Sequence, residues 1–331
     1  MKEKERIGII GCSSIATRVM LPAINKSNSC KIERIGSRSK IKAKKIALNV
    51  NCKKFGNYDE IIDDDDVNIV YVSLPIALQE YWIIKAAKAG KHILCEKSVS
   101  TSLSSIKKIW NECNKNKVKI LECFSYKYHP QQILVNKILQ KEKIGELRNF
   151  SSSFILPISP SLNNFRFNKK LGGGILNDVG CYIINASRFF INDEPISITC
   201  KLFKNKKYNI DVRGIIELSF KNQKTSFGLI GYDKMFSSDY RIFCENGSIV
   251  SNKAYNIKKS EYSEIKIMGK KNQKEKIIPK DQTKLMIEEF CKSINSKRFI
   301  LSKEIINQGK VLEAARISNN KKKTVFLRDL K

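Results

Sequence analysis

The chain has 331 residues, which exceeds one ordinary core and predicts two domains. Its 62 Lys+Arg outnumber its 32 Asp+Glu, so the formal net charge is +30, but only twelve of the basic residues are arginines. Because a surface that grips nucleic-acid phosphates favours the bidentate arginine, the dispersed lysines indicate a solvated basic surface that attracts small anionic ligands and has no nucleic-acid partner.

Cysteine and histidine usage narrows the class of protein further. The ten cysteines include no C-x-x-C pair, so we expect free, buried thiols in a reducing cytoplasm. Only two histidines occur, His92 and His129, which leaves almost no material for a His-rich zinc site or a Ser-His-Asp triad, and no metal is expected. No apolar run approaches the roughly 18 residues of a membrane span, so we expect a cytoplasmic protein with no membrane partner.

The first domain is expected over residues 1–125, where short apolar strands alternate with helical patterns. This alternation is typical of α/β proteins with a doubly wound parallel sheet of the Rossmann type. Four consecutive aspartates, Asp63–Asp66, predict a solvated acidic turn, because adjacent positions cannot all face one metal ion. The expected strands are Arg6–Ile10, Lys31–Gly36, Asn68–Ser73, Lys91–Cys95 and Val118–Cys123, and the expected helices are Ser14–Ala23, Ile41–Asn49, Gln79–Ala89 and Ser102–Asn114.

The first strand is followed by GCSSIA, in which Gly11, Ser13 and Ala16 fill the three small-residue positions of a dinucleotide-binding turn. The first position needs glycine for a tight turn, the second lets the backbone approach a pyrophosphate, and the third packs the helix against the strand. Ser13 replaces the second glycine, and its side chain narrows the approach. By itself the motif is also compatible with a plain strand-to-helix turn.

The second strand ends in Gly36-Ser37-Arg38, at the point where NAD-preferring sites carry an acidic residue that accepts from the ribose hydroxyls. An arginine beside a serine suits a 2′-phosphate instead, because charge-assisted hydrogen bonds hold a doubly charged group well. We therefore predict NADP(H) over NAD(H). The alternative is that Arg38 is only a surface charge.

Glu96 and Lys97 directly follow the fourth expected strand. The carboxyl ends of the strands are where parallel α/β sheets bind their ligands. From the residues alone, Lys97 is equally compatible with a salt-bridged residue at the sheet edge and with a catalytic ammonium.

The second domain is expected over residues 126–331, where alternating segments follow one another without intervening helices. This pattern predicts an α+β domain with a large, mostly antiparallel sheet. The stretch Gly269–Lys276 is expected as a charged loop. The expected strands are Glu146–Ile155, Ser197–Phe203, Gly214–Phe220, Thr225–Gly231, Tyr240–Cys244 and Glu264–Met268, and the expected helices are Pro130–Lys141, Asp178–Phe190, Thr283–Ile294 and Ser302–Asn319.

Three consecutive glycines, Gly172–Gly174, precede a helical pattern that carries Asp178 and Tyr182. Glycines allow close approach of the backbone to a ligand, and residues four apart lie on one helix face. Such a pair is usually a surface hydrogen bond. Beside a glycine-rich loop, it becomes a candidate proton donor with a supporting carboxylate.

Together these motifs resemble the Gfo/Idh/MocA oxidoreductases, the family of glucose-fructose oxidoreductase and inositol dehydrogenase. The resemblance covers essentially the whole chain and rests on GCSSIA, the Ser-Arg pair, SLP with AGKHILCEK, YKYHP at 126–130, IGELR at 144–148 and GGGILNDVGCY at 172–182. It implies an N-terminal Rossmann domain, and a C-terminal open sheet that commonly mediates a homodimer or homotetramer. Ser98 departs from the family, which has a proline there.

The resemblance also implies roles for individual residues. Lys97 matches the catalytic lysine, Tyr182 the residue that exchanges the substrate's proton, and Asp178 the carboxylate that orients Lys97 or the substrate. Substrate contacts are expected at Tyr126, at Tyr232 and at His129, for which a capping or core role is the alternative. The cofactor is expected to contact Gly11, Ser13, Ser14, Ile15, Ser37, Arg38, Ser73, Leu74, Pro75, Gln79, Glu96, Lys97 and Arg166.

The tyrosine at position 182 is typical of the branch that contains glucose-fructose oxidoreductase, dihydrodiol and xylose dehydrogenases, and the nucleotide-linked ketosugar reductases. Within this branch the chain is most similar to the nucleotide-linked hexose 3-ketoreductases, in GCSSIATRVMLPAI, the Tyr81-Trp82 pair and GYDKMFSSDYRIFCENGSI. The resemblance therefore implies an enzyme, an NADP(H)-dependent oxidoreductase acting on CH-OH groups. Its expected substrate is a small carbohydrate, a ketosugar either with or without a linked nucleotide, in surface glycan or deoxysugar synthesis. One alternative is a dehydrogenase of a free sugar or small diol, similar to xylose and dihydrodiol dehydrogenases. The other is an inactive cofactor-binding sensor or interaction protein.

Overall fold

The computed structural model describes residues 3–161, 164–296 and 301–330, which form two compact units. The first unit takes Met1–Ser125 together with Asp281–Ile306, and the second takes Tyr126–Lys280 together with Asn307–Lys331. The sequence assigns Asp281–Ile306 to the second domain, and here the structure differs. Helix α8 (Gln282–Ile294) packs against α1 (Leu21–Asn25) within the first unit, because it buries one apolar stripe made of Met286, Ile287, Phe290 and Cys291.

The first unit is built on a parallel sheet of six strands in the order β3-β2-β1-β4-β5-β6, as the doubly wound pattern predicts. Buried parallel strands have apolar residues on both faces, and all four residues of β4 are buried. The sequence pattern misses β3, which has only three residues. The strands are β1 (Glu5–Ile10), β2 (Cys30–Gly36), β3 (Lys54–Gly56), β4 (Ile69–Val72), β5 (His92–Cys95) and β6 (Ile120–Glu122).

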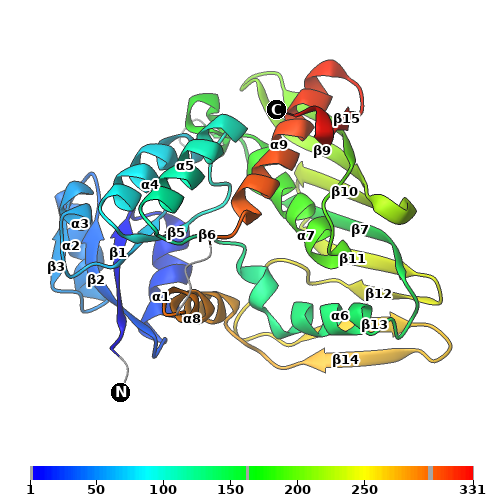
Figure 1. The fold of residues 1–331 in the computed structure, drawn as a ribbon, viewed down its shortest axis with the longest axis horizontal. Helices are drawn as coiled ribbons and strands as arrows, with labels where there is room; N and C mark the ends of the chain where they lie inside the picture. Colours follow the sequence, from blue (N-terminus) through cyan, green and yellow to red (C-terminus); the bar gives the residue numbers. More distant parts are fainter. Residues whose placement is uncertain (1–2, 162–163, 297–300, 331) are drawn as a thin grey trace. The chain divides into compact units, whose positions relative to one another are not determined.

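Helices lie on this sheet in two groups that Figure 1 shows, α4 beside α5 and α1 beside α8. The expected first helix is divided into a π-helical segment, Ala16–Met20, and α1, with Pro22 at the start of α1 where its missing N–H costs nothing. The remaining helices of this unit are α2 (Lys40–Asn49), α3 (Asp59–Ile62), α4 (Gln79–Lys88) and α5 (Leu103–Lys115).

The second unit is built on a sheet of nine strands in the order β14-β13-β12-β11-β7-β10-β9-β8-β15. All neighbouring pairs are antiparallel except β7 and β10, which confirms the expected mostly antiparallel sheet. The strands are β7 (Leu147–Leu156), β8 (Ser197–Asn205), β9 (Ile210–Ser219), β10 (Thr225–Tyr232), β11 (Ser237–Cys244), β12 (Gly247–Ser251), β13 (Ser263–Met268), β14 (Gln273–Ile277) and β15 (Val325–Phe326).

Helices cover one face of this sheet, where α6 (Pro130–Gln140) lies against β13 and α7 (Cys181–Ile191) lies against β7 and β9 (Figure 1). A π-helical turn, Leu176–Gly180, leads directly into α7, and α9 (Glu304–Lys321) begins in the first unit and continues in the second. The opposite face is open: in β13 buried and exposed residues alternate strictly.

Two expected loops differ from the structure. Gly269–Lys276 is not a loop throughout, because Gln273–Ile277 pairs with β13 as an edge strand, and its exposed lysines are the kind of side chain that protects an edge from further pairing. Asp63–Asp66 is not simply solvated either. The Asp64 side chain is only 7% exposed, and it accepts from Arg34 Nε at 2.7 Å.

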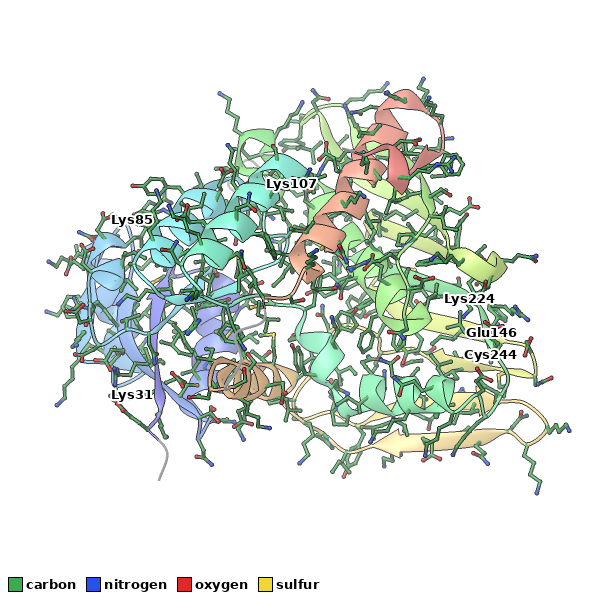
Figure 2. All side chains as sticks on the ribbon, in the orientation of Figure 1. Lys31, Lys85, Lys107, Glu146, Lys224 and Cys244 are labelled. Carbon is green, nitrogen blue, oxygen red and sulfur yellow. The ribbon has the colours of Figure 1, made fainter. Side chains whose placement is uncertain are left out.

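The basic side chains are spread over many elements of both units. Figure 2 labels Lys31 on β2, Lys85 on α4, Lys107 on α5 and Lys224 before β10. Lys224 pairs with Glu146 at 2.9 Å, so part of the charge is locally compensated. All ten cysteines are free, and nine of them are buried. Among the described residues, no helix is both long enough and apolar enough to cross a membrane.

Candidate active site

The turn after β1 brings backbone from two strands into close contact. Gly11 has φ 101°, and a Cβ there would lie 2.4 Å from the Ser73 carbonyl oxygen, so only glycine fits. Its amide donates to the Gly36 carbonyl at 3.2 Å. The turn therefore lies where β1, β2 and β4 end, the edge at which parallel sheets bind dinucleotides.

Ser13 uses its hydroxyl within this turn. The side chain accepts from the Ala16 amide at 3.1 Å and bonds to the Ser73 hydroxyl, so it caps the start of the helix. Ser14 and Ile15, which follow it, are exposed. A helix start with exposed neighbours suits a diphosphate, because unpaired amides and the helix dipole favour negative charge.

Ser37 and Arg38 directly follow β2, and they differ in solvent exposure. Ser37 is buried and its hydroxyl accepts from the Ser39 amide at 3.2 Å, while Arg38 is exposed. Burial raises the pKa of the neighbouring Tyr58, and the Arg38 charge opposes that rise. An exposed guanidinium at this strand end, without an acidic residue in Gly36-Ser37-Arg38, fits a 2′-phosphate. With the Gly11 turn, these residues fit NADP(H).

The segment after β5 is held by buried side chains from neighbouring elements. Gln79, at the start of α4, has no exposed surface, donates to the Ser98 carbonyl at 2.9 Å and accepts from the Cys95 thiol at 2.6 Å. Glu96 accepts from the hydroxyl of buried Tyr71 at 2.7 Å. The sequence predicts Gln79 as a cofactor contact, whereas the structure shows it holding the chain beside Lys97.

Lys97 itself lies partly buried, next to a cis peptide bond to Ser98. Two neighbouring loops complete the same edge of the sheet: Ser73 is buried after β4, and Leu74 and Pro75 are partly buried. The structure thus brings the predicted cofactor residues of the first unit to the carboxyl ends of β1, β2, β4 and β5.

In the second unit, Asp178 gathers two residues that the sequence predicts for other roles. Its carboxylate is 5% exposed and accepts from Arg166 Nε at 2.5 Å and from the Tyr232 hydroxyl at 3.1 Å. Burial and the Asp178 charge raise the pKa of Tyr232 well above its ordinary value, so this phenol stays protonated. Burial by itself would lower the pKa of Arg166. The charge of Asp178 and its hydrogen bond act in the opposite direction, so the pKa of Arg166 is raised overall. The result is a hydrogen-bonded ion pair.

Tyr182 lies one turn beyond Asp178 and is partly exposed. Its ring packs among aromatic side chains, with centroids 5.2 Å from Phe154, 5.4 Å from Tyr255 and 6.0 Å from Tyr126. A partly exposed phenol that packs against aromatic rings is a candidate proton donor to a bound polar ligand.

All three predicted substrate residues are buried, with Tyr232 at 7% exposed. Tyr126 is 1% exposed and donates to Asn185 Oδ1 at 2.8 Å. His129 is fully buried, and its Nδ1 accepts from the Gln131 amide at 3.2 Å as the N-cap of α6, which is the alternative that the sequence left open. Burial lowers the pKa of His129 to about 4.

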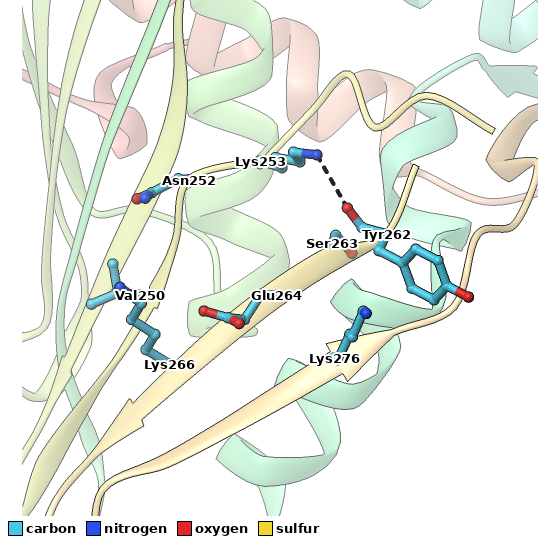
Figure 3. Close-up of a pocket in the computed structure, with 8 residues that line it drawn as sticks. All are labelled: Val250, Asn252, Lys253, Tyr262, Ser263, Glu264, Lys266 and Lys276. Atoms are coloured by element: carbon cyan, nitrogen blue, oxygen red, sulfur yellow. Dashed lines mark hydrogen bonds between the residues drawn. The ribbon is translucent and has the colours of Figure 1, made fainter. Parts of the chain in front are cut away.

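One hollow on the second unit involves none of the predicted residues. A cavity of about 390 Å³ lies over β12–β14, lined by residues that include Val250, Glu264, Lys266 and Lys276 (Figure 3). Among the described residues, no group of three or more His, Cys, Asp or Glu could hold a metal ion.

Asp211 is not predicted from the sequence; it accepts from the Leu176 amide at 2.9 Å at the start of the helix that carries Asp178. Its only signal is an acid in a strand-forming run that also holds Arg213 and Glu217, which is too weak to single it out. Together, the geometry offers a dinucleotide-binding edge in the first unit and a phenol with a supporting ion pair in the second, the groups that carbonyl reduction needs.

Two family models match the chain. The one described as "Oxidoreductase family, NAD-binding Rossmann fold" matches residues 5–124, and the one described as "GFO/IDH/MocA C-terminal domain" matches residues 133–250. Among solved structures, KijD10, a 3-ketoreductase from Actinomadura kijaniata in complex with NADP and TDP-benzene, has a TM-score of 0.89 and 26% identity, covering 96% of this chain and 98% of that one.

Curated relatives cover most of the chain. The dTDP-3,4-didehydro-2,6-dideoxy-alpha-D-glucose 3-reductase of Saccharopolyspora spinosa is 28% identical over 297 residues, which are 89% of each protein. The D-xylose 1-dehydrogenase (NADP(+)) 2 of Haloferax volcanii is 26% identical over 259 residues, or 78% of this chain and 79% of the relative. Both are oxidoreductases that act on sugars.

Proposed function

The chain belongs to the Gfo/Idh/MocA oxidoreductase family, and we propose that it is an NADP(H)-dependent reductase of a nucleotide-linked ketosugar. The observation that carries the proposal is the cluster in which Asp178, ion-paired to Arg166, lies one helical turn from Tyr182. The names of the relatives with 28% and 26% identity support the same substrate class.

The cofactor proposal rests on the first unit. Gly11 permits the tight turn against Ser73, the hydroxyl of Ser13 bonds within the same turn, and exposed Arg38 would hold the 2′-phosphate. When bound, NADP(H) supplies the hydride that reduces the carbonyl carbon. The site in the first unit would hold the cofactor through the residues at the ends of β1, β2, β4 and β5.

Proton transfer is proposed for Tyr182. As a ketone is reduced, its oxygen gains negative charge and needs a proton, which a phenol on a helix can donate. The Lys97 ammonium would stabilise the developing charge. Asp178 would keep its ion pair with Arg166, so that Arg166 and Tyr232 stay fixed beside the helix that carries Tyr182.

The test uses nicotinamide absorbance, with NADPH and a panel of nucleotide-linked ketosugars and free aldoses. We expect oxidation of NADPH with a nucleotide-linked ketosugar. Tyr182→Phe should lower kcat by about 100-fold or more, and Lys97→Met by a similar factor, while both variants bind NADPH. Turnover near that of the wild type in both variants would contradict the assignment.

The same panel separates the alternatives. The relative named as a xylose dehydrogenase makes a free sugar the second candidate, and activity restricted to free aldoses would favour it. NADPH binding without turnover of any sugar would favour a cofactor-binding sensor. A matched control is Tyr262→Phe, an exposed tyrosine on the second unit outside the cluster, which should leave kcat unchanged.

We further propose that the protein acts in the cytoplasm as a homo-oligomer joined through the open face of the nine-stranded sheet. Strand register places Phe203, Phe227 and Phe243 on this face, and they are 45%, 38% and 41% exposed. Exposed aromatic residues in a patch are typical of interfaces. Sedimentation of the wild type and of Phe227→Asp tests this proposal, since the substitution should shift the mass towards that of a monomer.

A further inference from the structure

The helix that carries Asp178 and Tyr182 begins in a turn that two other parts of the second unit hold in place. Gly174 has φ 118°, and its amide donates to the Arg166 carbonyl at 2.9 Å. The Asp178 amide donates back to the Gly174 carbonyl at 3.1 Å. The turn thus connects the loop of Arg166 to the first residues of the helix.

Asp211, near the start of β9, lies directly against this turn. Its Oδ2 accepts from the Leu176 amide at 2.9 Å, and its Oδ1 would lie 2.4 Å from a Cβ added to Gly174. The carboxylate therefore occupies the space that any side chain at position 174 would need. It also satisfies an amide in the first turn of the helix, where no intrahelical partner exists.

The surroundings of Asp211 keep it in this position. Burial raises the pKa of its carboxyl group, while the amides of Leu176 and Ile175 and the nearby Arg316 charge oppose the rise. Arg316 also donates to Asn177 Oδ1 at 2.8 Å. A carboxylate at a helix N-terminus is favoured by the helix dipole, so the interaction stabilises both groups.

We infer that Asp211 is a positioning residue for the reaction: it caps the helix start from another strand and thereby holds Tyr182 and Asp178 in their working geometry. The inference rests on the proposed function for its catalytic consequence. The side chain of Asp211 accepts from the Leu176 amide, so it acts through the backbone of the turn.

The test compares Asp211→Asn, which keeps an acceptor oxygen of the same shape, with Asp211→Ala and Asp211→Val, which remove it. Hydrogen–deuterium exchange over residues 172–182 should accelerate in the Ala and Val variants and stay near wild type in Asn. With the sugar that the wild type reduces, kcat should fall by about 100-fold in Ala and Val, because a misplacement of roughly 1 Å has that cost. NADPH affinity should be unchanged.

Glu313→Gln is the matched control, because it removes the other carboxylate beside Arg316, at 3.0 Å, without touching the turn. It should leave exchange and kcat unchanged. Val suits a strand, so it serves if the Ala variant does not fold. Unchanged exchange in Ala or Val, or equal losses in Asn and Ala, would overturn the inference. If the wild type reduces no ketosugar, the proposed function fails, and exchange still decides whether Asp211 holds the turn.

Discussion

The turn after β1 and the turn before α7 each contain a glycine that leaves no room for a side chain, but different groups fill the space. In each, a Cβ added to the glycine would lie 2.4 Å from an oxygen, the Ser73 carbonyl for Gly11 and the Asp211 carboxylate for Gly174. The first obstacle is backbone of the adjacent strand, which any parallel sheet of this topology provides. The second is one side chain from a distant strand. The geometry of the turn after β1 therefore follows from the fold, whereas the start of the helix that carries Tyr182 depends on individual residues.

The two regions also handle charge differently. At the cofactor edge Arg38 is exposed, ready for a ligand. In the second unit the positive charge of Arg166 is compensated within the protein, because Arg166 Nε lies 2.5 Å from the Asp178 carboxylate. The first region thus presents an exposed cation, while in the second the pKa values of Arg166 and Tyr232 are raised, so both stay protonated beside Asp178.

Substitution of the two glycines is expected to have the largest effects and to separate the regions. Gly11→Ala and Gly174→Ala each force a side chain into an oxygen at a positive φ, which should cost roughly 2–4 kcal/mol of folding free energy. Gly11→Ala should abolish measurable NADPH binding. Gly174→Ala should retain NADPH binding and lose turnover. Cofactor fluorescence and steady-state kinetics measure the two effects.

The control for these variants is Gly90→Ala. Gly90 has φ 71°, but a Cβ there has no heavy atom within 4 Å among the described residues. Strain without a clash should cost only about 1 kcal/mol and leave both cofactor binding and turnover intact. Equal losses of NADPH binding in Gly11→Ala and Gly174→Ala would show that the two turns do not have separate roles.

Arg38→Ala tests whether Arg38 makes the first unit prefer NADPH to NADH. Removal of a charge-assisted contact to a 2′-phosphate should raise the KM for NADPH by roughly 10-fold and leave the KM for NADH unchanged. Steady-state kinetics with both cofactors provide the measurement, and exposed Lys40 provides a control as Lys40→Ala. An equal change for NADPH and NADH would assign Arg38 to general surface charge.

Both sheets could be predicted from the sequence because hydrophobic periodicity reports local burial. The expected strand Tyr240–Cys244 lies within β11, and Lys31–Gly36 is within one residue of β2. In the second sheet the short strands β12, β14 and β15 are missed. Of these, β14 is an edge strand with four exposed residues of five, so it carries almost no apolar signal. Helix α8 has the expected pattern, but periodicity does not say which core an amphipathic face will join.

The candidate site divides in the same way. Gly11 and Lys97 could be predicted because each lies within two residues of the end of a strand that the sequence pattern indicates, β1 and β5. The contact of Tyr232 with Asp178 joins residues 54 apart, and the contact of Asp211 with Leu176 joins residues 35 apart. No periodicity encodes such pairs, so the sequence predicted the members Asp178, Arg166 and Tyr232 without predicting that they meet.

His129 is expected to affect stability and to leave turnover unchanged, because its cap on α6 is local, made to an amide two residues away. The unfolded histidine binds a proton below about pH 6.5, and burial lowers the pKa of the folded one to about 4. The unfolded chain thus binds more protons between these values, so His129 contributes stability above pH 6.5 that is lost as the pH falls towards 4, on the order of 3 kcal/mol at most. His129→Asn keeps a capping oxygen without titrating, so urea unfolding across this range should show a flatter pH dependence than the wild type. Since the cap lies outside the Asp178 cluster, kcat at neutral pH should stay unchanged, and a loss of turnover in His129→Asn would instead couple this local contact to the catalytic helix.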